Sequence, residues 1–208
     1  MPIATSHDVD ELRGRGLALA GLTIAWNVIE AIVAITAGIA AGSIALVGFG
    51  FDSALEVMSS VVVVWQFRGE ARSGYDEDRE RLALRLIAVS FFILATYVTF
   101  EVIRDLFFTD GRADESVVGI VLAALSLLVM PTLALAKRRT ADALGSPTLR
   151  ADSRETLLCA WLSAALLGGL ILNAAFGWSW ADPIAALAIA AFAVNEGIEA
   201  WGGDDDDH

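Results

Sequence analysis

Six long apolar runs follow one another along this sequence of 208 residues, at 17–40, 44–65, 82–102, 117–135, 157–173 and 184–200. Each run reaches or approaches the ~20 residues that an α-helix needs to span ~30 Å of hydrocarbon. Only 19% of the residues are charged, whereas about a quarter are charged in a typical soluble domain. We therefore predict an all-α integral membrane protein that is a bundle of six transmembrane helices.

The runs and their short connections use nearly the whole chain. We expect residues 1–16 to be a cytoplasmic N-terminal segment, 17–201 to be the transmembrane domain and 202–208 to be a solvated acidic tail. The first run follows Asp8, Asp10 and Glu11 and is longer than the apolar core of a cleaved signal peptide, so we interpret it as a membrane helix. No C-terminal cytoplasmic domain is expected.

The charge balance and the rare residue types exclude some functions. The net charge is −12, and such a surface repels nucleic acid. Cys159 is the only cysteine, so an intrachain disulfide is excluded. His7 and His208 are terminal, and we assign neither a role in a site.

Basic residues mark one side of the predicted bundle. They precede the first run and fill the connections after the second and fourth runs, whereas the connections after the first and fifth runs carry none. Because lysine and arginine favour the cytoplasmic side of short loops, both termini are predicted to be cytoplasmic. The alanine- and arginine-rich, lysine-poor composition favours the inner membrane of a bacterium. The basic residues are Arg13, Arg15, Arg68, Arg72, Arg79, Arg81, Arg85, Lys137, Arg138, Arg139 and Arg150.

Five acidic residues require an explanation because of where they fall: Glu30, Asp52, Glu56, Asp152 and Glu155. A charge at the centre of a bilayer costs at least ~2.5–3.5 kcal/mol, and an acid found there is by default a functional hypothesis. Glu30 lies at mid-depth in the first span, and we predict that it is a proton relay.

Two pairs of residues are spaced to share a helical face. Asp52 and Glu56 are four residues apart, and so are Glu155 and Cys159. At a rise of 1.5 Å per residue, each pair lies roughly 13–20 Å from the start of its helix, and the two helices start on opposite sides of the membrane. They therefore meet near the middle of the membrane, as a tetrahedral metal site requires. Asp152 lies one turn before Glu155 and is a further candidate ligand.

Simpler interpretations of these residues exist. A membrane acid can be protonated and hydrogen-bonded to its neighbours, serving packing only. Asp152 can instead form an ion pair at the membrane interface with Arg150 or Arg154. A lone cysteine such as Cys159 is more often a small buried hydrophobe.

Three segments together resemble the cation diffusion facilitator (cation efflux) family. Residues 42–46 (GSIAL) and 51–56 (FDSALE) resemble its second helix, and 149–156 (LRADSRET) resembles its fifth. Residues 182–187 (DPIAAL) resemble the start of its sixth helix, and Asn27 matches an asparagine of its first. The resemblance covers about residues 17 to 201.

The resemblance implies export of divalent metal ions from the cytoplasm in exchange for protons, by a homodimer in the lipid bilayer. Asp52 and Glu56 then supply ligands, while Glu155 takes the place of the usual histidine and Cys159 that of the usual aspartate. Both replacements affect metal preference, so zinc is the first expectation and manganese, iron and cobalt remain open. The metal is a substrate, and no prosthetic group is expected.

Two other classes of protein compete with a transporter. The replaced ligands fit a non-transporting membrane scaffold, or a metal-binding regulator derived from a transporter. An enzyme is not expected, because Asp52 is displaced by one residue from the Gly-x-Gly-Asp pattern of intramembrane aspartyl proteases and its Tyr-Asp partner is absent from the spans. No nucleophile elbow or phosphate-binding glycine loop is present either.

Overall fold

The computed structural model describes residues 6–41, 44–108, 117–176 and 181–202, and these are helical except at two short connections. The predicted all-α fold class is thereby confirmed. Residues 1–5 and 203–208, which include most of the predicted acidic tail, lie outside the described residues. The helices are α1 (Ser6–Ala41), α2 (Ile44–Ser73), α3 (Glu77–Phe108), α4 (Val117–Leu144), α5 (Pro147–Phe176) and α6 (Ala181–Gly202).

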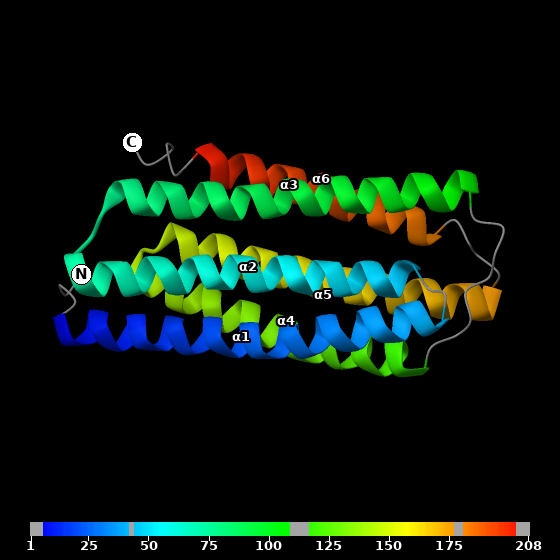
Figure 1. The fold of residues 1–208 in the computed structure, drawn as a ribbon, viewed down its shortest axis with the longest axis horizontal. Helices are drawn as coiled ribbons and strands as arrows, with labels where there is room; N and C mark the ends of the chain where they lie inside the picture. The colour runs from blue at the N-terminus through cyan, green and yellow to red at the C-terminus, as the bar shows by residue number, and fades with distance from the viewer. Residues whose placement is uncertain (1–5, 42–43, 109–116, 177–180, 203–208) are drawn as a thin grey trace.

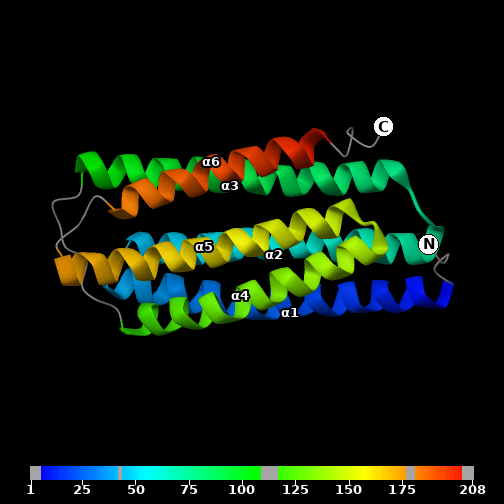
Figure 2. The ribbon, with the colours of Figure 1, turned by 180° about the vertical axis from the view of Figure 1, so that it is seen from behind.

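The helices form three layers of two, with α1 beside α4, α2 beside α5 and α3 beside α6 (Figures 1 and 2). The α2/α5 layer lies in the middle and contacts both outer layers. Successive helices run in opposite directions, so α1 begins and α6 ends at the same end of the bundle (Figure 1). The two helices that were predicted to carry the site are therefore the innermost pair.

Four of the described helices, α1 to α4, are long and apolar enough to cross a membrane. Large apolar side chains such as Leu22, Ile32, Phe100 and Leu128 are exposed on the outside of the bundle. An apolar surface of this extent is suited to contact with lipid. The membrane-spanning character is thus confirmed, whereas crossing by α5 and α6 and the sidedness of the termini stay predictions.

The helices extend beyond the apolar runs that predicted them. α2 continues to Ser73, α4 continues to Leu144, and α5 already begins at Pro147. Hydropathy marks the part of a helix that lies in hydrocarbon, but the backbone hydrogen bonds continue until a capping residue ends them. This is why the apolar runs are shorter than the helices at the end of the bundle that carries the basic residues.

The connection between α4 and α5 shows such capping residues. Gly145 has φ of 65°, the left-handed conformation with which glycine commonly ends a helix. Ser146 then caps α5, because its Oγ accepts a hydrogen bond of 3.3 Å from the backbone N–H of Leu149. Pro147 occupies the first helical position, which suits its fixed φ.

A glycine lets α1 and α2 approach closely beside the predicted site. A Cβ atom at Gly50 would lie 2.6 Å from Cγ1 of Ile35 and 3.1 Å from the carbonyl oxygen of Ala31. Small residues at such crossings allow the backbones of membrane helices to come together. Gly50 precedes Asp52 by two residues, so the close approach occurs at the level of the candidate ligands.

Candidate cation site

The five acids predicted inside the membrane are all buried in the centre of the bundle. Each side chain is at most 3% exposed, and they come from α1, α2 and α5. Unlike the apolar exterior, the interior also contains Asn27, Gln66 and several hydroxyl groups. Buried carboxylates at this depth require protons, hydrogen-bond donors or cations as partners.

Asp52 and Glu56 lie one turn apart on α2, and Cys159 of α5 lies beside both. One carboxylate oxygen of Asp52 and both oxygens of Glu56 have no hydrogen-bond partner. Thr156 is close to Glu56, but its hydroxyl donates to the backbone oxygen of Asp152 instead, at 3.1 Å. The carboxylate oxygens between α2 and α5 are therefore left available as acceptors.

Asp152 is surrounded by hydrogen-bond donors. One carboxylate oxygen accepts hydrogen bonds from Ser59 and Ser60, each of 3.0 Å, and the other lies 2.7 Å from the Nζ of Lys137. Lys137 also donates to Ser60 at 3.1 Å and to Thr156 at 2.9 Å. An ion pair therefore forms, but neither Arg150 nor Arg154 is the partner. Whether Asp152 also ligates a metal stays a prediction.

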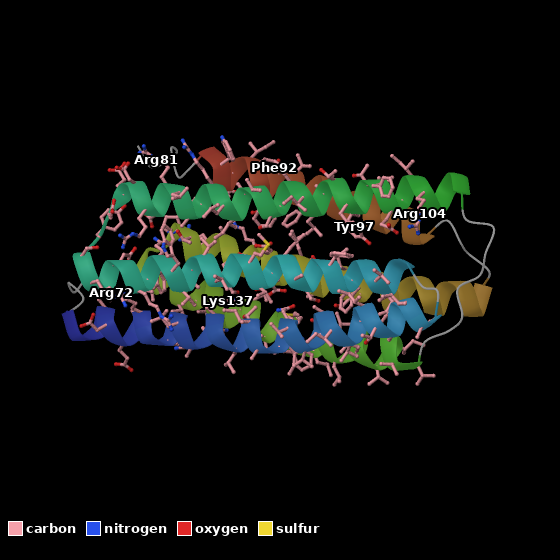
Figure 3. All side chains as sticks on the ribbon, in the orientation of Figure 1. Arg72, Arg81, Phe92, Tyr97, Arg104 and Lys137 are labelled. Atoms are coloured by element: carbon pink, nitrogen blue, oxygen red, sulfur yellow. The ribbon has the colours of Figure 1, made fainter. Side chains whose placement is uncertain are left out.

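Lys137 is the residue of this group that the sequence analysis missed. It was counted among the basic residues that mark one side of the membrane, but it is completely buried in α4. In Figure 3 it lies between the end of the bundle that carries Arg72 and Arg81 and the middle. The two arginines beside Asp152 have other partners, because Arg150 pairs with Asp142 and Arg154 with Glu196 and Glu199.

The helical periodicity of α4 contains a signal for Lys137. Met130, Ala134, Lys137 and Ala141 are all buried, and their spacing of four, three and four residues is that of one helical face. The apolar run ends near 135, but the face directed at the core continues for two more turns. Extending the periodicity beyond the hydropathy boundary identifies Lys137 as an inward-facing residue.

Glu155 of α5 lies between α2 and α3. Its carboxylate lies close to the hydroxyl groups of Ser59 on α2 and Ser90 on α3. Neither hydroxyl satisfies it, because Ser59 donates to Asp152 and Ser90 donates to the backbone oxygen of Ile87. Both oxygens of Glu155 consequently lack a hydrogen-bond partner.

Glu30 reaches the same polar interior from α1. The indole Nε1 of Trp26 donates a hydrogen bond of 3.1 Å to one carboxylate oxygen, and the other oxygen has no hydrogen-bond partner. The hydroxyl groups of Ser53 on α2 and Ser126 on α4 lie beside it. Glu30 therefore lies where α1, α2 and α4 meet.

These side chains form an open polar cluster and not an assembled metal site. Within the part of the chain that the structure describes, no three histidine, cysteine, aspartate or glutamate side chains are placed so that they hold one ion together. Coordination of a cation therefore requires these side chains to rotate so that their ligand atoms converge on one point. The predicted ligand set, Asp52, Glu56, Glu155, Cys159 and Asp152, thus stays a prediction.

An all-helical bundle with an apolar exterior and buried carboxylates at its centre defines the general class, an integral membrane protein that handles ions. The family model of the cation efflux transmembrane domain matches residues 21–200 of this chain. The chain therefore belongs to the cation efflux family, as its motifs indicated. This is a family of transporters and not of enzymes.

Three curated relatives were compared with the chain. An uncharacterized transporter of Synechocystis is 25% identical over 71% of this chain and 49% of its own length. Transmembrane protein 163 of Xenopus laevis is 28% identical over 73% of this chain and 53% of its own length. The cation-efflux pump FieF of Shewanella oneidensis is 30% identical over 38% and 26%. The chain thus spans about half the length of the first two.

Proposed function

We propose that this protein transports divalent metal cations across the membrane, exporting them in exchange for protons through a site between α2 and α5. The observation that carries this proposal is the set of unpartnered carboxylate oxygens on Asp52 and Glu56, buried next to Cys159 where the two central helices pack together. Buried acceptors without donors are unfavourable in an empty protein and are satisfied by a bound cation.

Proton exchange follows from the chemistry of these ligands. Carboxylates bind a metal only when they are ionised, so metal binding releases protons and protonation expels the metal. Alternating exposure of the site to the two sides of the membrane then couples the two fluxes. Glu30 faces the same interior, and a proton relay through it stays part of this proposal.

The preference for a metal depends on the two ligands that differ from those of the family. Zinc remains the first expectation, with manganese, iron and cobalt as alternatives. Glu155 replaces an imidazole with a carboxylate, which favours a harder ion, whereas a thiolate at Cys159 favours a softer one.

The proposal also covers the membrane topology, the oligomeric state and the location of the protein. Six membrane crossings with both termini in the cytoplasm agree with Arg72 and Arg81 at the end of the bundle where α1 begins (Figure 3). The likeness to transporters of this family supports a homodimer, and the composition supports the inner membrane of a bacterium.

A non-transporting scaffold or metal-binding regulator is the alternative function. It is favoured by the replacement of two expected ligands by Glu155 and Cys159 and by the absence of an assembled site among the described residues. Such a protein binds metal or a partner without moving ions.

Metal uptake into proteoliposomes separates these functions. The purified full chain is reconstituted and exposed to zinc, manganese, iron or cobalt under a pH gradient. We expect saturable uptake of at least one metal that is lost in Asp52→Asn. Asp142→Asn is the matched control, because it makes the same chemical change at an exposed carboxylate outside the site. Absence of flux with every metal, from folded protein, would favour the scaffold or regulator.

A further inference from the structure

Of the two acids around Asp52, Glu56 belongs to the family motif and Glu30 does not. The charged groups acting on Asp52 are Glu56 and Glu30, and the nearest thiol is that of Cys159. The same three acids, Asp52, Glu56 and Glu30, are also the charged neighbours of Cys159. The carboxylate of Glu155 instead lies beside Ser59 of α2 and Ser90 of α3, and its charged neighbours are Asp152 and Glu56, not Asp52.

Glu30 is held in an orientation suited to a ligand. It is completely buried, and the hydrogen bond from Trp26 fixes one carboxylate oxygen while the other remains unpartnered. Metal-ligating carboxylates are commonly oriented in this way by a hydrogen bond from an outer residue. The close approach of α1 and α2 at Gly50 brings Glu30 within reach of the α2 pair.

We propose that Glu30 is a ligand of the transported cation and takes the place that the family motif gives to Glu155. This inference rests on the proposed function and specifies its site. The ligands then come from three helices: Glu30 from α1, Asp52 and Glu56 from α2, and Cys159 from α5. Glu155 acts outside the coordination sphere, at the contact between α2, α3 and α5.

The chemistry of such a site is coherent. Three carboxylates and one sulfur make four donors, the number that a tetrahedral divalent metal site requires. No imidazole is needed, so the missing histidine is compensated by an oxygen ligand from α1 and not by the glutamate at the same position. Because three of four donors are oxygens, manganese as well as zinc is a suitable probe.

Reciprocal substitutions test this assignment in the full chain. Binding of Zn²⁺ and of Mn²⁺ to the detergent-solubilised protein is measured by isothermal titration calorimetry. We expect Glu30→Gln to weaken binding of the better-bound metal about 100-fold and Glu155→Gln to change it less than threefold. Glu11→Gln is the control on the same helix, because Glu11 is exposed, and it should bind like the wild type.

Glu30→Asp provides a second variant in case the neutral one fails to fold. It keeps the buried charge but withdraws the carboxylate by one carbon–carbon bond, about 1.5 Å. We expect binding to weaken at least tenfold, since a ligand is sensitive to position. Wild-type affinity in this variant would overturn the inference.

The other outcomes separate the inference from the proposed function. Loss of binding in folded Glu155→Gln, with Glu30→Gln unchanged, overturns the inference and leaves the proposed function standing. Wild-type affinity with altered proton coupling in Glu30→Gln also overturns it, and makes Glu30 a relay only. If the wild type neither binds nor transports any of the metals, the proposed function itself fails.

Discussion

The ammonium nitrogen of Lys137 lies 2.7 Å from a carboxylate oxygen of Asp152, and both side chains are completely buried. The pair joins α4 to α5, and through Ser60 it also reaches α2. It lies next to Glu56, whose carboxylate is in the electrostatic field of Lys137. The positively charged side chain of Lys137 is therefore held in place beside the candidate site.

Removing one partner of this ion pair should destabilise the protein strongly. Lys137→Met leaves the Asp152 carboxylate buried without a cation, which typically costs about 3–5 kcal/mol of unfolding free energy. The double variant Lys137→Met/Asp152→Asn should recover most of that loss, because neither partner of the pair is then left as an unpaired buried charge. Denaturant unfolding in mixed micelles measures both. Breaking the exposed Arg150–Asp142 pair serves as control and should cost less than about 1 kcal/mol.

Glu56→Gln should abolish metal binding while making the empty protein more stable. Both oxygens of Glu56 are buried without a hydrogen-bond partner, and an amide adds donors for neighbouring acceptors. We expect a gain of about 1–3 kcal/mol in unfolding free energy. Glu77→Gln, at an exposed position, should change stability by less than about 0.5 kcal/mol. A loss of stability in Glu56→Gln would contradict a site maintained for binding.

Cys159→Ser should change which metal is preferred. A hydroxyl is a poorer ligand than sulfur for zinc and has less effect on a hard ion such as manganese. We expect zinc affinity to fall about tenfold or more and manganese affinity to stay within a few fold. Competition binding on the same preparation gives the ratio directly. Equal changes for both metals would show that Cys159 is a packing residue.

Metal binding should weaken as the pH falls. Each ligand carboxylate must lose its proton before it coordinates the cation, so protons compete with the metal. Zinc or manganese titrations between pH 7.5 and about 5.5 should show a steadily rising dissociation constant, with protons released to the buffer on binding. A dissociation constant that does not depend on pH would remove the basis for proton exchange.

The positions of the helices could be predicted because hydropathy and residue spacing are properties of short stretches of sequence. Runs of apolar residues located all the helices, and the interval of four residues between Asp52 and Glu56 fixed their common face. Helix ends were less predictable, since α2 and α4 continue in polar sequence until Gly74 and Gly145 end them.

The orientation of individual side chains depended on contacts that sequence spacing does not contain. Glu155 shares a helical face with Cys159, yet it lies toward Ser90 of α3. Burial of Lys137 depends on the packing of α4 against α5, which places its amino group beside Asp152. Contacts with α1 and α3 thus decided which acids gather around Asp52.

Gly50 controls how closely α1 approaches α2 beside the candidate site. Because the backbones of α1 and α2 meet where glycine leaves no Cβ, the gap between these helices sets how far Glu30 can reach toward Asp52. A bulkier residue there would separate the two backbones and widen the proposed cation site without replacing any of its ligands. The distance between α1 and α2 would then set the affinity of the proposed site for its ion.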